Sequence, residues 1–380
     1  MLILLLLLIF IRPFISSLAY PYANFLYMSL STVLVSSWII FRRKKISINN
    51  QVAAALVLFL LNVVLSMLFS YDKLSAIQGA GNYLVGILFF FFAASLEDRE
   101  RKLLLSFMTL AALVIAVLAI YQYFFGFRHL LEYLARQKNS YDFALDYIGR
   151  WRAFFPFVTP NILAVYLGMS LFLSTTQRNK FIYIIPISFA LLLTKSLGVF
   201  LSLLIAAVIY FLLKGRLKKK HIVILCGLIV ICGLIFIVRT NAQKLHQTPS
   251  FSTLMRLGYW RDTLQIIKSH PFIGVGPGNF NLLQSRYSHN SYLQICAEVG
   301  LIGFLPFIWF LVAGVAGLGK KIKHPPQPHI YLAGTAASCV FLLHNIIDFG
   351  FFLPEVSMIW WLIMGLVLGG WSSPRLSSCK

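Results

Sequence analysis

The side chains best suited to chemistry lie in one polar, glycine-rich stretch, residues 256–303, which runs into an apolar segment. His289 stands just before that apolar segment, and Arg256 opens the stretch. A neutral imidazole can take a proton from a hydroxyl near neutral pH. A guanidinium can hold two phosphate oxygens through parallel hydrogen bonds. The stretch therefore combines a candidate general base with a candidate anion-binding group.

A polar residue at a helix start is most often a cap or an interfacial group. The interpretation of His289 therefore depends on where it lies relative to the membrane. A helix that begins near residue 291 would leave His289 at the outer membrane surface, facing the same compartment as the arginine-rich connections. Catalysis is therefore one interpretation, and capping or interfacial placement is the other. Asn290 would orient the imidazole or a ligand. Glu298 would lie about two and a half turns deeper, where a carboxylate needs a partner.

Residues 251–268 have imperfect helical spacing and would form a helix on the membrane surface. Its apolar face would consist of Leu254, Leu257, Trp260, Leu264 and Ile267, although Ile266 breaks the pattern. Arg256, Trp260 and Arg261 would then lie at headgroup level. One interpretation is interfacial anchoring. The other is that the guanidinium groups hold a lipid diphosphate, which suits arginine better than lysine.

Two glycine patterns in the stretch do not indicate a nucleotide site. Residues 274–278 read Gly-Val-Gly-Pro-Gly, but neither a preceding strand nor a following Gly-Lys-Ser/Thr accompanies them. We expect a backbone reversal there instead. Gly300 and Gly303, three residues apart, are expected to allow close helix packing.

Polar residues elsewhere give weaker candidates on the same side of the membrane. Arg152, in the Arg-Trp-Arg sequence at 150–152, would be an anchor or a second cationic group in an outer cavity. His344, Asn345 and Asp348 lie at the outer end of the apolar segment 329–347. We expect them to form hydrogen bonds between helices, with cavity lining as the second interpretation. Two histidines and one carboxylate from separate segments are too loose a set to indicate a metal, so neither a metal nor another cofactor is expected.

The elements that must position these groups are membrane-spanning helices. The chain of 380 residues is 59% hydrophobic and 12% charged, with a mean hydropathy of +0.82, which excludes an ordinary soluble domain. Apolar runs of about 18 to 25 residues can cross a bilayer as helices, and the alternating strands of a barrel are absent. We predict an all-α bundle of about twelve transmembrane helices, forming a single integral membrane domain over 1–380. The predicted spans are roughly 2–20, 23–41, 51–70, 77–96, 103–127, 154–176, 181–194, 196–213, 221–238, 291–318, 329–347 and 356–372.

The basic residues predict which side each connection faces. Nineteen of the 33 Lys and Arg residues lie in short connections and the C-terminal tail, which places these connections and both termini in the cytoplasm. This topology, rather than nucleic acid, would account for the net charge of +22. Most other basic residues lie in two long connections, about 128–153 and 239–290, which the positive-inside rule does not constrain. The second connection is predicted to be a large external loop with an interfacial helix, between the ninth and tenth spans.

Residues 256–303 resemble the signature region of the O-antigen ligase and polymerase superfamily, membrane glycosyltransferases with a GT-C-like helical fold. The His-Asn pair at 289–290 is followed, after nine residues, by Gly-x-x-Gly, which matches the ligase pattern at every specified position. Weaker similarities are Arg152 before Pro-Asn at 160–161, and the hairpin Thr-Lys-Ser-Leu-Gly at 194–198. The family's large external loop between its ninth and tenth helices is similar to the predicted arrangement.

The resemblance implies an inverting, metal-independent glycosyl transfer on the periplasmic face of the bacterial cytoplasmic membrane. The donor would be a glycan on undecaprenyl diphosphate, and the acceptor a hydroxyl of lipid A-core or of another glycan. The same resemblance makes His289 the base, Arg256 a diphosphate contact and Arg152 a weaker second cation. One position departs from the family, because Leu197 stands where the hairpin normally has Arg. Lys195 would replace it only as a point charge on another face.

We therefore predict a multi-pass glycosyltransferase of cell-surface polysaccharide biosynthesis, of the O-antigen ligase type. The histidine spacing favours a ligase over a polymerase, and a protein O-oligosaccharyltransferase shares the signature. A flippase or other transporter of lipid-linked glycans is the non-enzyme alternative, but the sequence shows neither paired halves nor broken helices in corresponding positions, as a transporter should. A structural membrane scaffold is a third interpretation, and it predicts that His289 and Arg256 can be replaced without effect.

Overall fold

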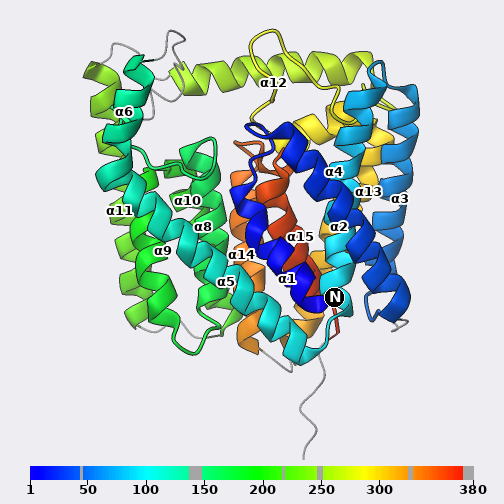
Figure 1. The fold of residues 1–380 in the computed structure, drawn as a ribbon, viewed down its shortest axis with the longest axis horizontal. Coiled ribbons are helices and arrows are strands. Elements are labelled where there is room, and N and C mark those ends of the chain that lie inside the picture. Colours follow the sequence, from blue (N-terminus) through cyan, green and yellow to red (C-terminus); the bar gives the residue numbers. More distant parts are fainter. Residues whose placement is uncertain (43–45, 137–147, 216–218, 246–250, 324–327, 371–380) are drawn as a thin grey trace, which may run out of the picture.

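The computed structural model describes residues 1–42, 46–136, 148–215, 219–245, 251–323 and 328–370. It is 80% helix, and no strand occurs among these residues, so the predicted all-α class is confirmed. Most helices run up and down in a bundle, and α12 (Phe251–Ser269) lies across one end of it (Figure 1). Every candidate site residue belongs to the described parts of the chain.

Each of the twelve predicted apolar segments contains a helix. In chain order the elements are α1 (Leu2–Ile11), the 3-10 turn η1 (Arg12–Phe14), α2 (Pro21–Arg42), α3 (Asn50–Phe69), α4 (Lys73–Ser95), α5 (Asp98–Tyr121), the π-helical turn η2 (Gln122–Gly126), α6 (Phe127–Arg136), α8 (Pro160–Ser174), α9 (Lys180–Thr194), α10 (Leu197–Leu213), α11 (Lys219–Leu245), α12 (Phe251–Ser269), α13 (Ser291–Lys323), α14 (Pro328–His344), the 3-10 turn η3 (Gly350–Phe352) and α15 (Pro354–Leu368).

Five helical segments of the described chain are long and apolar enough to cross a membrane. They are Pro21–Arg42, Asn50–Phe69, Lys73–Ser95, Asp98–Glu132 and Ser291–Leu318. The other apolar helices have 10–17 residues, which is below the length of about 20 that a straight span requires. The helical class of the prediction therefore holds, whereas the number of twelve spans is not confirmed.

Several predicted boundaries were wrong, because hydropathy marks an apolar run and not the end of a helix. The span predicted for 2–20 ends as α1 at Ile11, directly before a 3-10 turn that contains Pro13, since proline lacks the amide that a continuing helix needs. Conversely, α5 continues through η2 into α6, which covers part of the connection predicted for 128–153. Helix α11 likewise extends to Leu245, into the predicted external loop.

Helix α15 is the buried centre of the bundle. All its residues are buried, and it packs closely against α4 and α14. Glycines allow this approach: a Cβ atom on Gly365 would lie 2.2 Å from Phe90 O, and one on Gly86 would lie 2.3 Å from the indole nitrogen of Trp361. Helix α15 therefore fixes the position of residues 345–353, the segment that precedes it.

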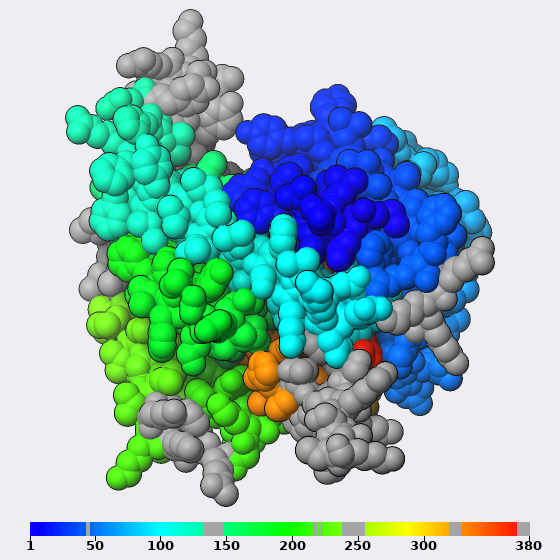
Figure 2. Space-filling model, turned by 60° about the horizontal axis from the view of Figure 1, so that its bottom comes forward, coloured from blue at the N-terminus to red at the C-terminus, as the bar shows by residue number. Residues whose placement is uncertain are grey.

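Helix α5 joins the two sides of the bundle. It packs against α1 on one side and α9 on the other. In the view from below, α5 (cyan) lies between the blue N-terminal helices and the green helices of the opposite side (Figure 2).

A buried ion pair ties the turn after α1 to α15. Arg12 Nη2 lies 3.3 Å from Glu355 Oε2, and both side chains are buried. Arg12 also donates to Asn24 Oδ1 at 2.7 Å, and the amide of Ser17 donates to Glu355 Oε1 at 3.2 Å. Because breaking one partner of a buried pair leaves an uncompensated charge, the pair holds this turn firmly against the core.

Helix α13 is interrupted at Gly300, whose φ of 64° and ψ of −178° are not helical. The main chain of residues 271–276 lies against the interruption, and its amides donate to Ala297 O and Glu298 O at 3.0 and 2.9 Å. A Cβ atom on Gly300 would lie 2.1 Å from Phe272 O. Gly300 thus admits a neighbouring main chain into a broken helix, whereas we expected it to serve helix packing.

The glycines at 274–278 form the predicted backbone reversal. All three have positive φ values, 76°, 102° and 73°, which favour glycine. A Cβ atom on Gly276 would lie 2.3 Å from Ser70 Cβ, and one on Gly278 would lie 2.5 Å from Ser75 O. The reversal is therefore packed between α3, α4 and the start of α13.

Candidate active site

The turn that carries His289 is set by the residues around it. His289 directly precedes α13 and has a left-handed backbone, with φ of 53°. The hydroxyl of Ser288 donates to Asn290 O at 2.6 Å. Asn290 Oδ1 accepts from the amides of Tyr292 and Leu293, both at 3.1 Å. Asn290 therefore caps α13 and positions His289 through the main chain, whereas we expected its side chain to orient the imidazole or a ligand.

A buried carboxylate, Asp348, lies between two histidines. Asp348 Oδ2 is 3.1 Å from His344 Nε2, and Asp348 Oδ1 is 3.9 Å from His289 Nδ1. The carboxylate accepts a hydrogen bond from His344 and faces His289 across a longer gap. The His289 side chain is 29% exposed, whereas Asp348 is buried. A carboxylate in this position can orient an imidazole and stabilise its protonated form.

Ser291 joins the start of α13 to the segment that carries Asp348. Its hydroxyl donates to Asn345 Oδ1 at 2.6 Å. Its amide lies 2.9 Å from Asn345 O and 3.0 Å from Asp348 O. These bonds bring His289 and Asp348 together from two distant parts of the sequence.

Burial keeps the imidazole of His289 neutral, and two neighbouring charges act on it in opposite directions. Burial lowers the pKa of His289, the charge of Asp348 opposes that shift, and the charge of Arg256 adds to it. Burial alone would raise the pKa of Asp348. The hydrogen bond and charge of His344, together with His289 and Arg256, outweigh burial and lower this pKa to about 2. The site therefore holds a neutral imidazole beside an ionised carboxylate near pH 7.

Aromatic rings hold the imidazole on two sides. The Tyr259 ring stacks on His289 with centroids 5.7 Å apart and an interplanar angle of 20°. Phe349 meets His289 edge to face at 4.9 Å. Trp260 Nε1 donates to His289 O at 3.4 Å. Helix α12 therefore touches the histidine directly, and Trp260, a candidate from the sequence, contacts its main chain.

Arg256 lies close enough to His289 and Asp348 to shift both pKa values. It stands about one turn before Tyr259 on α12. Within the described part of the chain, Arg256 has no hydrogen bond or ion pair. Arg261 is exposed, and within the described residues it forms no hydrogen bond or ion pair with His289. The structure thus brings Arg256, but not Arg261, to the cluster.

Arg152, in the segment before α8, is buried against the hairpin between α9 and α10. Its Nε donates to Thr194 O at 2.9 Å, and its Nη2 donates to Asn161 Oδ1 at 2.9 Å. The hydroxyl of Ser196 donates to the same Asn161 oxygen at 3.0 Å. The similarity seen between Arg152, the Pro-Asn pair and the hairpin therefore corresponds to one connected set of hydrogen bonds.

Lys195 has a left-handed backbone, with φ of 50°. Its ammonium donates to Arg150 O at 3.2 Å and lies 6.0 Å from the centre of the Tyr123 ring. Burial lowers the pKa of Lys195, and the charge of Arg152 adds to that shift. Leu197, which departs from the family pattern, packs against the hydrophobic core. The ammonium of Lys195 therefore does not take the place of the Leu197 side chain.

The hairpin between α9 and α10 contacts the cluster of His289, His344 and Asp348 in the first turn of α10. A Cβ atom on Gly198 would lie 3.3 Å from the His344 ring, and His344 in turn contacts Asp348. Arg152, Lys195 and His289 thus belong to neighbouring parts of one region. Across the described residues, no group of three or more His, Cys, Asp or Glu side chains is placed to hold a metal ion.

These features define a class of protein. The described chain has five helices of membrane-spanning length, and a cluster of titratable groups lies near α12, which crosses one end of the helical bundle (Figure 1). These are the features of an integral membrane protein with a polar site at one end of its bundle.

The comparison with known families is more specific. Residues 182–308, which are 127 of the 380 residues, match the family model described as O-antigen ligase. The matched segment runs from α9 to the middle of α13 and contains Lys195, Arg256 and His289. The recognition made from the sequence is therefore confirmed, and it supports an enzyme of the glycosyltransferase-like ligase or polymerase type. No curated protein matches the chain.

Sequence reasoning missed the pairing of Asp348 with His289. The available signal was the spacing of four residues between His344 and Asp348, both placed at the outer end of an apolar segment. That spacing puts two side chains on one face of a helix, but it does not show which other segment they meet.

Proposed function

We propose that the protein transfers a glycan from an undecaprenyl-diphosphate carrier to an acceptor hydroxyl on the outer face of the cytoplasmic membrane. The observation that carries this proposal is the neutral imidazole of His289, which faces the ionised Asp348 with Arg256 nearby. A hydroxyl needs a base when it attacks, and a departing diphosphate needs positive charge. The cluster supplies both.

In the proposed reaction, Asp348 favours the tautomer of His289 that carries its proton on Nδ1, which leaves Nε2 as the basic nitrogen. The acceptor oxygen attacks the anomeric carbon while its proton passes to Nε2. The bond from the anomeric carbon to the diphosphate oxygen breaks, and undecaprenyl diphosphate leaves with the electron pair. This single displacement inverts the anomeric configuration and needs no covalent enzyme intermediate.

Arg256 is proposed to stabilise the leaving diphosphate. Its guanidinium has no ion-pair partner among the described residues, and it lies on a helix that touches the base. Arg152 and Lys195 are proposed as a second cationic group that holds the carrier diphosphate before reaction. The link from the hairpin through Gly198 to His344 supports this role.

Transfer to lipid A-core is the preferred reaction, because the spacing of the histidine pair from Gly300 fits ligases. A polymerase or a protein O-oligosaccharyltransferase would use the same base and the same leaving group with another acceptor. The proposed orientation, with both termini in the cytoplasm and α12 outside, rests on the distribution of basic residues in short connections.

The test is the length and attachment of surface glycan in the native host. A deletion strain is complemented with the intact gene, with His289→Ala or with His129→Ala. His129 is an exposed histidine on α6 and serves as the matched control. We expect His129→Ala to restore the glycan and His289→Ala to fail.

The glycan that accumulates in the His289→Ala strain then identifies the reaction. Long chains left on the lipid carrier indicate a ligase, and single repeats indicate a polymerase. Full restoration by His289→Ala in a strain that needs the gene would contradict the proposed base.

A further inference from the structure

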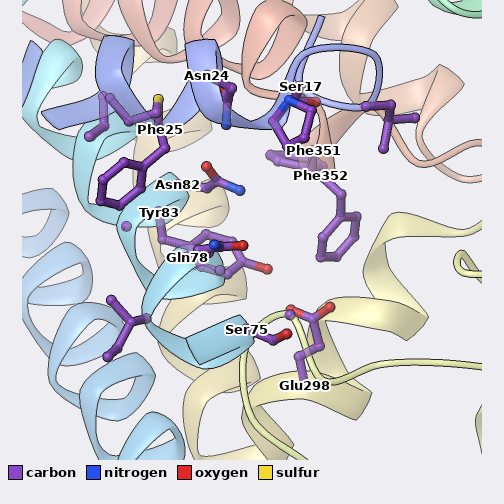
Figure 3. Close-up of a pocket in the computed structure, with 18 of the residues that line it drawn as sticks. Ser17, Asn24, Phe25, Ser75, Gln78, Asn82, Tyr83, Glu298, Phe351 and Phe352 are labelled. Atoms are coloured by element: carbon purple, nitrogen blue, oxygen red, sulfur yellow. The ribbon is translucent and has the colours of Figure 1, made fainter. Parts of the chain in front are cut away.

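A polar cavity lies close to the candidate active site. Its volume is about 320 Å³, and it is bounded by α2, α4, the start of α13, the segment around Tyr287 and η3. Figure 3 shows side chains of these elements directed toward a common space, with Glu298 and Ser75 at one end. The turn held by the Arg12–Glu355 ion pair closes another side, through Ser17 and Asn24.

Glu298 presents an unpartnered oxygen at this cavity. Its side chain is only 1% exposed. Oε1 accepts a hydrogen bond from Gln294 Nε2 at 3.1 Å, and the Gly278 amide lies close to the carboxyl group, whereas Oε2 is buried without a hydrogen bond of good geometry in the described structure. A buried carboxylate oxygen without a donor is unfavourable. A ligand with hydroxyl groups would supply the missing donor.

The remaining walls combine amide groups with aromatic rings. Gln78, Asn82 and Asn24 offer donors and acceptors, and Tyr83 and Phe352 offer flat apolar faces (Figure 3). A sugar ring presents hydroxyls at its edge and apolar C–H groups on its faces. Cavities with apolar walls and a few convergent polar groups are typical ligand sites.

A pair of aromatic rings separates this cavity from His289. Tyr287 lines the cavity and stacks on Phe349 at 4.1 Å, and Phe349 in turn meets the imidazole at 4.9 Å. The hairpin that Arg152 binds contacts His344 through Gly198. The cavity instead contains the carboxyl group of Glu298, and Arg286, which also lines it, is exposed.

We propose that this cavity binds a neutral sugar residue of the acceptor glycan, with Glu298 accepting a hydrogen bond from one of its hydroxyls. This inference rests on the proposed function, because it places the acceptor on the side of the base away from the diphosphate. An attacking hydroxyl approaches the anomeric carbon opposite the leaving group. An acceptor held beyond Tyr287 and a carrier held near Arg256 would satisfy that geometry.

Gly81 allows the cavity to be blocked without strain. It lies on α4 and lines the cavity, and a Cβ atom there would meet nothing within 4 Å. Gly81→Leu should therefore occupy the space of the sugar while α4 is retained. Gly227 on α11 also has open space around an added Cβ and does not line the cavity, so Gly227→Leu is the matched control.

The experiment measures binding to the full-length protein in lipid nanodiscs. The probe is the labelled oligosaccharide mixture that mild acid releases from the glycolipids of a host lacking the gene, which includes unreacted acceptor. We expect saturable binding to the intact protein, to His289→Ala and to Gly227→Leu. Binding should weaken at least about tenfold in Gly81→Leu and several-fold in Glu298→Gln, since each change removes contacts at the sugar itself.

Two outcomes would overturn the sugar site: no saturable binding to the intact protein, or equal binding to Gly81→Leu and Gly227→Leu. Failure of the proposed function has a different result, because His289→Ala would then support normal glycan transfer in the host whatever the binding data give. Thermal melting of each variant in nanodiscs shows whether it is folded. If Gly81→Leu is unfolded, the comparison of Glu298→Gln with the intact protein decides the test instead.

Discussion

Replacing Asp348 by Asn tests the proposed active site most directly. The exchange keeps the shape of the side chain and an oxygen able to accept from the amide of Phe349, which Asp348 Oδ1 binds at 2.9 Å. It removes the negative charge 3.9 Å from His289 Nδ1. In the proposed reaction the imidazole becomes positively charged as it accepts the proton, so the lost attraction acts on the transition state rather than on the resting enzyme.

The size of the effect follows from that distance. Two unit charges 3.9 Å apart attract each other by about 4 kcal/mol at an effective dielectric constant of about 20. A loss of this size slows a reaction by roughly a thousandfold. Because His289 is 29% exposed, solvent screening weakens the interaction, and we expect a fall in the transfer rate of about 10² to 10³.

The assay is single-turnover transfer of a lipid-linked glycan in proteoliposomes, measured as a function of pH. Activity requires neutral His289, so it falls on the acid side as the imidazole becomes protonated. Asp348 raises the pKa of His289, so Asp348→Asn should move this acid limb to lower pH while the plateau rate falls. Asp262→Asn, which changes an exposed carboxylate on α12, is the control and should leave both unchanged. A full plateau rate in Asp348→Asn, or an acid limb moved to higher pH, would refute the reasoning.

Three further predictions concern charge, backbone and pH. Arg256→Lys should lower transfer by roughly tenfold and Arg256→Ala by roughly a hundredfold, because lysine keeps the charge but not the paired hydrogen bonds; donor titrations in the same assay measure this, and equal rates for both variants would oppose it. Gly300→Ala should abolish folded protein, since its Cβ would lie 2.1 Å from Phe272 O, whereas Gly317→Ala, whose Cβ would lie 3.8 Å from its nearest neighbour, should melt normally. The pKa of Asp348 is about 2 instead of 3.8, so its contribution of about 2 kcal/mol to the free energy of unfolding is complete above pH 4 and lost as pH falls through 2. In a plot of melting temperature against pH, Asp348→Asn should therefore flatten the acid part of the curve.

The sequence was sufficient to predict the helical class and the approximate place of each apolar helix, but not α6, because long apolar runs leave few alternatives in a membrane. It also singled out His289, the proposed base, since the histidine spacing lies within one continuous segment. What it could not provide is contact between distant segments. The meeting of Asp348 with His289 depends on the bonds that Ser291 makes to residues 345–348, and no local pattern encodes such bonds.

The same limit explains the different role of Gly300. Two glycines three residues apart indicate close approach, but the pattern does not show what approaches. Gly303 does lie near a neighbouring helix, with an added Cβ 3.4 Å from Asn62 Cβ. Gly300 instead admits the main chain of 271–276. Likewise, Asn290 was predicted beside the imidazole because it is adjacent in sequence, whereas its side chain is used by the helix cap.

The interruption of α13 has a mechanical consequence for the site. The main chain of residues 271–276 is hydrogen-bonded to both parts of the helix, because its amides donate to Ala297 O and Glu298 O before the interruption, and its carbonyls accept from the amides of Leu301 and Ile302 after it. This double attachment holds the two parts of α13 at one angle. A membrane helix tilts when the bilayer becomes thinner or thicker. A tilt of the part that follows Gly300 is therefore passed on to residues 291–299, and through them to the turn that carries His289.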